Sequence, residues 1–187
     1  SDALVEDGSI YVGTTPSSTD AALDNTSLGI NALSSITTGD DNTALGTDAL
    51  KSNTTGEYNT SVGSGTLENS TTGSANTGVG ERALTSNTTG GYNSALGFLS
   101  LNKNTTGKHN SALGYSSLRN NTTGESNVAL GYDALLKNTE GDYNVSVGYQ
   151  TLEANTTGNS NIAIGNKALT SNTTAEENIA IGYHSLY

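Results

Sequence analysis

The sequence predicts an all-β fold, a parallel β-solenoid, on two observations. The first is a repeat: glycine recurs at every seventeenth position from Gly29 to Gly182, ten times without an insertion. A coil stacked on identical coils must keep such a register, whereas a disordered chain has no reason to keep it. The second is composition: only 34 of the 187 residues are Leu, Val, Ile or Phe. That is too little apolar volume for a compact helical or α/β domain, so we expect a thin, repetitive interior.

The repeat unit is N-x-[small]-[Leu/Val/Ile]-G-x-x-[Ala/Ser/Thr]-L-x-x-N-T-T-G-x-x, and we number its positions from the first glycine, position 0. Its first five residues, such as Asn42 to Gly46, alternate with period two and predict a short strand. Asn-Thr-Thr-Gly is typical of a turn, because Gly tolerates positive φ. We expect a strand, a turn, a second extended segment around Ala-Leu and a wide turn. Ten coils about 4.8 Å apart would make a rod roughly 48 Å long.

The sequence predicts two parts. Residues 1–24 depart from the period, since Gly13 lies 16 residues before Gly29, and we expect a capping or irregular segment there, with a loop over 14–24. Residues 25–187 form the ten-coil solenoid. The last copy stops within a coil, so we expect the natural protein to continue.

The two faces of the predicted strand differ in side-chain size. Position −1 is Leu, Val or Ile in every copy, and we expect it to face the interior. Position −2 is always tiny; it packs either against other walls of its own coil or, the reading we favour, against a neighbouring chain. This expected inter-chain small face comprises Ala44, Ser61, Gly78, Ala95, Ala112, Ala129, Ser146, Ala163 and Ala180. One coil buries few large aliphatic side chains, and the free energy gained from this burial is small compared with the conformational entropy lost on ordering seventeen residues. Association would bury more apolar surface, so we expect a homotrimer about the fibre axis.

Position −4 is Asn in every copy. Stacked identical amides can form a hydrogen-bond ladder along the rod, and we expect a structural role for Asn42, Asn59, Asn76, Asn93, Asn110, Asn127, Asn144, Asn161 and Asn178. Asn-x-Ser/Thr sequons are abundant, for example at Asn53 and Asn155. Glycans would crowd most coils of a eukaryotic secreted protein, so a bacterial or viral source is the simpler explanation.

Position +1 carries aromatic residues in the later coils, namely Phe98, Tyr115, Tyr132, Tyr149 and Tyr183. An aromatic column stabilises stacked strands by itself, and this is the interpretation we favour. The alternative is a glycan-contacting platform, since rings offer an apolar face to sugars.

The sequence predicts no catalytic, metal-binding or cofactor-binding residues, and hence no enzyme. It contains no Cys, and His109 and His184 have no metal-type spacing or catalytic partner. No phosphate-binding or calcium-binding motif is present. Seven scattered basic residues against eighteen acidic ones argue against nucleic acid as a partner, and the absence of any long apolar run argues against membrane insertion.

Copies such as Asn93 to Phe98 (NSALGF), Asn127 to Leu135 (NVALGYDAL) and Asn161 to Leu169 (NIAIGNKAL) resemble two groups of proteins. One is the head of bacterial trimeric autotransporter adhesins, a left-handed parallel β-roll; the other is the repetitive shaft of bacteriophage tail fibres, which the 17-residue period and the Asn-Thr-Thr-Gly segment resemble more closely. Position −3 varies along the chain, with Thr or Ser in six early coils and Val or Ile in the last four, so the two ends need not pack alike.

The resemblance implies a left-handed homotrimeric rod with no enzymatic activity. It also implies a structural or adhesive role on the virion, as a rigid spacer or as a receptor-binding element that contacts a host-surface glycan or another receptor. The alternative is the head of a bacterial trimeric adhesin on the cell surface. An ice-binding solenoid is a third reading, disfavoured because Thr54 and Thr55 are adjacent in a turn rather than alternating on a flat face.

Overall fold

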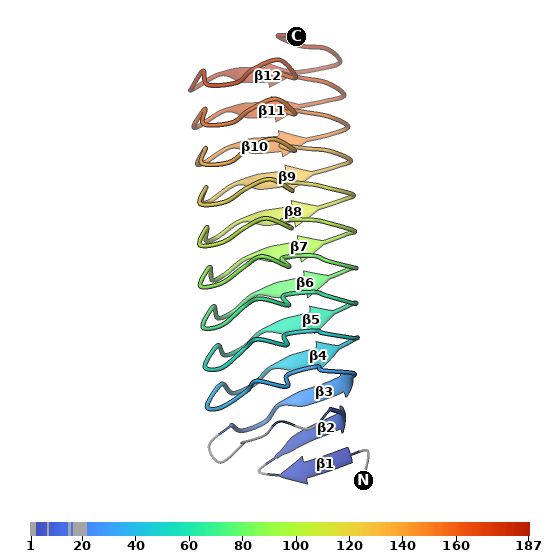
Figure 1. Cartoon of the computed structure of the whole chain (residues 1–187). Coiled ribbons are helices and arrows are strands. Elements are labelled where there is room, and N and C mark those ends of the chain that lie inside the picture. Colours follow the sequence, from blue (N-terminus) through green and yellow to red (C-terminus); the bar gives the residue numbers. More distant parts are fainter. Residues whose placement is uncertain (1–2, 7, 15, 17–21) are drawn as a thin grey trace.

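A computed structural model describes residues 3–6, 8–14, 16 and 22–187, and it confirms the parallel β-solenoid. Twelve short strands form one sheet in chain order, and the coils stack over one another from the N-terminal to the C-terminal end (Figure 1). The strands are β1 (Ala3–Glu6), β2 (Ser9–Gly13), β3 (Thr26–Gly29), β4 (Thr43–Leu45), β5 (Thr60–Val62), β6 (Thr77–Val79), β7 (Ser94–Leu96), β8 (Ser111–Leu113), β9 (Val128–Leu130), β10 (Val145–Val147), β11 (Ile162–Ile164) and β12 (Ile179–Ile181). The described residues include no helix.

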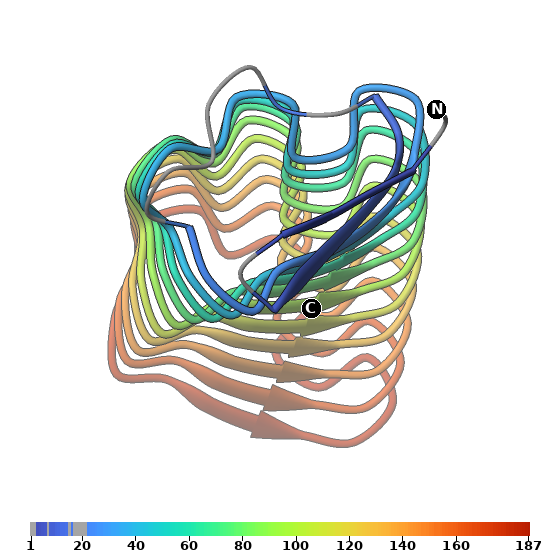
Figure 2. The same ribbon diagram turned by 90° about the horizontal axis from the view of Figure 1, so that it is seen from below.

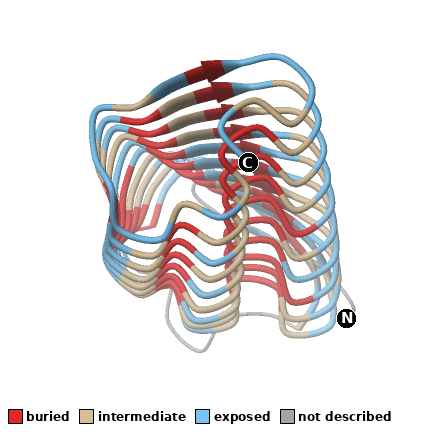
Figure 3. Cartoon of the chain, turned by 90° about the horizontal axis from the view of Figure 1, so that it is seen from above, coloured by how far each residue is buried: buried red, intermediate tan, exposed pale blue. Residues whose placement is uncertain are grey.

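Each coil contributes one strand, and its partner in the next coil lies seventeen residues on, as Ala44 pairs with Ser61. Every position of the repeat therefore stacks on itself. Seen along the stack, a coil is a loop with the strand on one side and an indented wall opposite (Figure 2). In Figure 3, with the C-terminal coils nearest the reader, the strand runs to the right along the upper edge and the chain returns along the lower one, so the solenoid winds left-handed.

The expected second extended segment is wrong: the residues around Ala-Leu form turns. Leu50 has φ 50° and Asp48 has φ 57°, both in the left-handed region, and the same two positions have positive φ in all ten coils. The turns are still bonded from coil to coil, since the Leu50 N–H donates to Thr66 O at 3.1 Å and the Thr54 N–H to Thr71 O at 2.9 Å. Backbone hydrogen bonds thus hold neighbouring coils together on the walls outside the sheet as well.

The interior of a typical coil holds one large apolar side chain, the Leu at position +4; the first coil buries Ile36, at position +7, as well. Leu50, Leu84 and Leu118 are completely buried, as are their equivalents from Leu33 to Leu152. Around this column lie the small residues at positions −2 and +3 and the asparagines at −4. The core is therefore thin and repetitive, as the composition predicts.

The structure reverses the two strand faces expected from the sequence. Position −1 points outward: Leu45 is 44% exposed and Leu113 46%. Position −2 points inward, so the assignment of a small inter-chain face is wrong. Its members are buried by their own chain alone: Ala44, Ser61, Gly78, Ala95, Ala112, Ala129, Ser146, Ala163 and Ala180.

Limited interior volume explains the reversal. A Cβ added to Gly78 would lie 2.6 Å from the Thr66 methyl and 3.6 Å from a Leu67 methyl of the preceding coil. The wall that carries positions +3 and +4 therefore comes so close to the strand that only small side chains fit beneath it. Because strand residues alternate between faces, the larger aliphatics are placed outside.

The N-terminal strands extend the stack by one imperfect coil. β2 pairs in parallel with β3, so that Gly13 stands opposite Gly29, and β1 pairs antiparallel with β2 at the end of the sheet. Ser9 takes the place of the ladder asparagine, since its Oγ accepts the Asn25 N–H at 2.9 Å. Tyr11 fills position −2 and is completely buried. Most of the expected loop over 14–24 lies outside the described residues.

Candidate functional site: the outer face of the sheet

An uncharged strip runs along the outer face of the sheet for all ten coils. It consists of position −1, always aliphatic, and position −3, always Thr, Ser, Val or Ile; we call it the sheet strip. Its position −1 members are Leu28, Leu45, Val62, Val79, Leu96, Leu113, Leu130, Val147, Ile164 and Ile181, and seven of these are between 36% and 66% exposed. Monomeric proteins rarely expose an apolar patch larger than a few hundred Å², so this strip is the candidate functional surface of the described residues.

A shallow apolar groove lies in the middle of the sheet strip. It has a volume of about 290 Å³ and crosses β6, β7, β8 and β9. Its floor includes Ser94 and Ser111, the smallest side chains found at position −3, and its walls include Leu96, Leu113 and Leu130. Towards the C-terminal end position −3 becomes Val128, Val145, Ile162 and Ile179, so the strip there is wholly aliphatic.

Sequence reasoning missed this surface because it placed position −1 inside. A signal was present, since neither −1 nor −3 carries a charged residue in any copy. At position −2, by contrast, the exclusion of large side chains reflects burial within the coil.

The asparagines at position −4 form a continuous, fully bonded ladder. In a typical step the Oδ1 of Asn42 accepts the backbone N–H of Asn59 at 3.0 Å and its Nδ2 at 3.1 Å. The same Nδ2 also donates to Gly73 O at 2.9 Å. These side chains are buried from Asn42 to Asn161, and burying an amide is favourable only when its donors and acceptors are paired. The ladder is part of the scaffold that holds the sheet strip.

A second asparagine ladder, which sequence reasoning missed, runs through position +7. It comprises Asn87, Asn104, Asn121, Asn138, Asn155 and Asn172, each Nδ2 after the first donating to the preceding Oδ1 at 2.8–2.9 Å. Both ladders meet on one carbonyl, since Gly56 O accepts from Asn42 and Asn53 at 2.9 Å each. The asparagines of the Asn-Thr-Thr sequons from Asn53 to Asn155 are buried, so a glycosyltransferase could not reach their amides in the folded chain.

The aromatic residues at position +1 form a stacked column on the surface. Centroid distances are 5.4 Å for Phe98–Tyr115, 5.0 Å for Tyr115–Tyr132 and 5.3 Å for Tyr132–Tyr149, with planes within 20° of each other. Tyr183 is separated from this column by Asn166 and instead contacts His184. Because stacked rings cover each other's faces, this geometry favours the structural role over a platform that offers ring faces to sugars.

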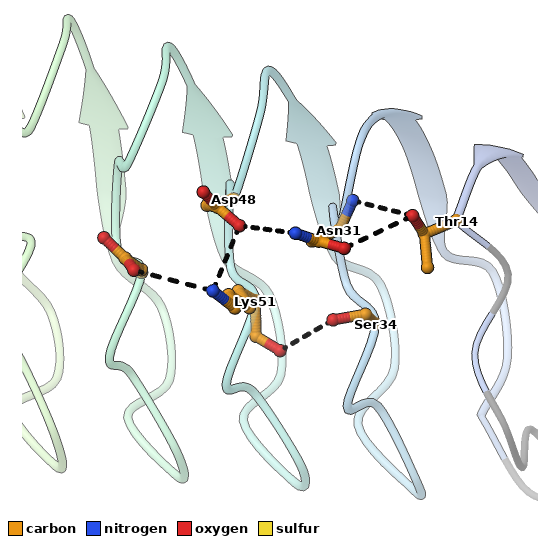
Figure 4. Close-up of polar contacts among 6 residues, drawn as sticks. Thr14, Asn31, Ser34, Asp48 and Lys51 are labelled. Carbon is orange, nitrogen blue, oxygen red and sulfur yellow. Dashed lines mark hydrogen bonds and ion pairs between the residues drawn. The ribbon is translucent and has the colours of Figure 1, made fainter.

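Polar side chains stack on another wall of the N-terminal coils (Figure 4). Asn31 Nδ2 donates to Asp48 Oδ1 at 2.9 Å, and Lys51 Nζ lies 3.2 Å from the same oxygen. The hydrogen bond from Asn31, followed by the Lys51 contact, lowers the pKa of Asp48. At the same repeat position in a later coil, burial and the nearby Glu153 raise the pKa of Asp133. Asp133 in turn raises the pKa of Tyr132. These shifts follow from local contacts of three separate side chains, Asp48, Asp133 and Tyr132. Asp48 lies five coils from the other two, so the three do not form one site for proton transfer.

Within residues 3–6, 8–14, 16 and 22–187, no group of three or more His, Asp or Glu side chains is placed to hold a metal ion. The same residues contain no helix of the length and hydrophobicity needed to span a membrane. No family model, no curated protein and no solved structure matches the chain.

Proposed function

We propose that this chain is a shaft segment of a homotrimeric fibre, a structural or adhesive element of the kind found in bacteriophage tail fibres. Such a segment would hold a receptor-binding tip at a distance or contact the host surface itself. The observation that carries the proposal is the sheet strip, which stays uncharged along the whole rod while a net charge of −11 is distributed over the remaining surface. Its place would be the virion, or the cell surface if the fibre is a bacterial adhesin.

The proposed partner is a second copy of the chain. A partner that covers the strip over its full length must repeat at the spacing of the coils, and an identical solenoid does so. The seven position −1 side chains that are 36% to 66% exposed offer on the order of several hundred Å², which approaches the roughly 800 Å² per partner of a specific interface. Association would also supply the apolar burial that a coil with one interior Leu lacks.

The geometry gives the ice-binding alternative little support. The threonines at position +8 donate to the next coil, as Thr54 Oγ1 does to Thr71 O at 3.1 Å. Their hydroxyls are therefore engaged within the solenoid and are not free to order water.

The oligomeric state tests the proposal. Sedimentation equilibrium of the full chain is expected to give three times the 19.0 kDa chain mass, and sedimentation velocity a frictional ratio typical of an elongated particle. Leu113→Lys places a charge in the strip without touching the interior, and we expect it to give monomers with an unchanged circular dichroism spectrum, because an unpaired charge would be buried between chains. Thr55→Lys, on an exposed corner, should remain trimeric. A wild-type chain that stays at 19.0 kDa at high micromolar concentration would refute the proposal.

A further inference from the structure

We infer that the stacked tyrosines Tyr115, Tyr132 and Tyr149 form a site of covalent modification, at which a one-electron oxidant links two neighbouring coils through a dityrosine bond. The oxidant would be a peroxidase that uses hydrogen peroxide and takes the phenols as its substrate. The feature that carries the inference is the close stacking of these rings on the surface. It does not depend on association of the chain with a second copy.

The register of the coils holds the three rings in stacking contact. The tyrosines follow β8, β9 and β10, whose parallel pairing places equivalent positions of the repeat side by side. The planes of Tyr115 and Tyr132 differ by 6° with centroids 5.0 Å apart, and those of Tyr132 and Tyr149 by 12° with centroids 5.3 Å apart. Nearly parallel rings on equivalent backbone positions bring their Cε carbons to about the centroid distance. A small rotation about the soft χ2 torsions then lets two of these carbons bond.

Solvent reaches all three rings. Tyr115 is 45% exposed, and Tyr132 and Tyr149 are each 44% exposed, so an oxidant can take an electron from the column without entering the interior. The negative charge of Asp133 raises the pKa of Tyr132, because it disfavours a second negative charge on the phenolate oxygen. The same charge makes loss of an electron from that ring easier. Oxidation is therefore favoured at the middle tyrosine.

The coupling balances in electrons and protons. Each phenol gives up one electron and its hydroxyl proton, and the radical that results has spin density on the oxygen and on the Cε carbons. Two radicals on adjacent rings form one Cε–Cε bond, and the hydrogen on each of these carbons moves to the phenol oxygen, which restores both aromatic rings. In total two electrons and two protons leave the pair, and one hydrogen peroxide takes them up to form two waters.

Stacking distinguishes these tyrosines from others that are more exposed. Tyr58 and Tyr143, both at position −5, are 62% and 64% exposed, but no tyrosine occupies that position in the coils next to them. Tyr92, at the same position, stacks on His109. A radical on any of these rings must first meet another radical, whereas in the column the partner is already in place, and coupling becomes an intramolecular step.

Oxidation of the intact chain with a haem peroxidase and hydrogen peroxide tests the site. At low micromolar concentration we expect dityrosine fluorescence in the band of 19.0 kDa chain mass on a denaturing gel, in a product lighter by two hydrogens. Trypsin cleaves after Arg119 and Lys137 and so places the three tyrosines of the column on three different peptides. The peptide that contains Tyr132 is expected to be linked to one of the other two.

Phenylalanine substitutions identify the partners, because they keep the ring and remove the phenol. Tyr132→Phe leaves Tyr115 and Tyr149 two coils apart, and we expect links within the column to fall by about tenfold or more, since separated rings have no proximity advantage. Tyr115→Phe leaves one stacked pair and should still link. Tyr143→Phe, which removes a more exposed but unstacked phenol, is the matched control and should not change the yield. An unchanged yield in Tyr132→Phe would overturn the inference, as would links found mainly between chains.

A gain of coupling tests whether stacking is sufficient. Tyr92 and His109 stack with centroids 5.1 Å apart and planes 14° apart, nearly the geometry of the column. His109→Tyr in the Tyr132→Phe background should therefore create a new intrachain link, between Tyr92 and the introduced tyrosine. Trypsin cleavage after Lys103 and Lys108 separates the two positions for mapping. If no link forms there while the variant keeps its circular dichroism spectrum, stacking at this distance does not produce coupling and the inference fails.

Discussion

Buried amides occupy, in this chain, the space that large aliphatic side chains fill in most interiors. The two ladders, at positions −4 and +7, pair the donors and acceptors of each typical asparagine with a neighbour or with a glycine carbonyl. Such networks stabilise a fold only when every member is satisfied. The residues at which a ladder is interrupted are therefore the most informative ones to change.

Ser70 is such an interruption. It stands between Asn53 and Asn87 in the second ladder, and among the described residues nothing hydrogen-bonds its buried Oγ. Ser70→Asn would restore links to both neighbours, and at about 1 kcal/mol per hydrogen bond we expect the free energy of unfolding to rise by about 1–2 kcal/mol in urea titration. Ser86→Asn, beside the ladder and only half-buried, should have little effect. A destabilised Ser70→Asn protein would mean that the coil has no room for the amide.

Asp48 and Asp133 occupy the same repeat position, +2, but their pKa values shift in opposite directions. The lowered pKa of Asp48 means that it stabilises the fold above the unfolded value of about 3.9, and that this contribution disappears as the pH falls through the folded pKa. The raised pKa of Asp133 means that its favourable contribution is present in acid and is lost as the pH rises through that pKa.

We therefore expect Asp48→Asn to lower, and Asp133→Asn to raise, the melting temperature at about pH 7. As the pH falls, the Asp133 difference should disappear first, as the pH passes through its raised folded pKa, and the Asp48 difference only at lower pH, as it passes through the lowered one. The two variants serve as controls for each other, because both residues have positive φ, 57° for Asp48 and 53° for Asp133, a conformation that Asn tolerates. Melting curves recorded from acid to neutral pH check the prediction. Changes of the same sign at neutral pH would contradict it.

At the scale of the coil, the glycine at position 0 sets how closely two coils approach. Gly80 has φ +125°, and a Cβ there would lie 2.7 Å from Gly97 O in the next coil. Gly182 has nearly the same φ, +123°, with nothing within 4 Å of its Cβ position. Position 0 thus combines two separable requirements, an unusual backbone conformation and a close contact.

Alanine at these two glycines separates the requirements. Gly182→Ala should cost about 1–3 kcal/mol of unfolding free energy from backbone strain alone. Gly80→Ala should cost clearly more, because two coils must also move apart, and denaturant melts of both variants measure the difference. Equal losses would show that strain accounts for the whole requirement.

The sequence predicted the 17-residue period of the coil and the parallel pairing of its strands. It did not predict which face of the strand is inside, nor the conformation of the Ala-Leu segment. The period fixed the stacking, and the alternation from Asn42 to Gly46 correctly paired positions −4 and −2 on one face. The alternation alone does not show which face is inside, because that depends on how closely the wall that carries Leu50 approaches the strand. The Ala-Leu segment was predicted as extended, whereas Leu at position +4 adopts positive φ in every coil, a conformation that L-residues other than Gly rarely adopt.

At the scale of the whole molecule, low apolar content and high net charge have one explanation. A solenoid with one interior Leu per coil needs few large side chains, and most of the remaining aliphatics of the repeat lie on a single uncharged strip. Association of copies stays a prediction; the face from which the sequence argued it, position −2, is buried within the coil. The residues of the candidate site became visible only once the structure showed which strand residues point outward.

The asparagine ladders also give the rod a direction. In the −4 ladder from Asn59 onward and in the +7 ladder from Asn104 onward, the amide nitrogen donates to the preceding coil, while the side-chain oxygen faces the following one. The side-chain dipoles consequently align head to tail, and each hydrogen bond polarises the next. Each coil thus presents side-chain acceptors towards the C-terminal end of the stack and side-chain donors towards the N-terminal end. The two sides of a coil are therefore not interchangeable, and a coil inserted upside down would break both ladders.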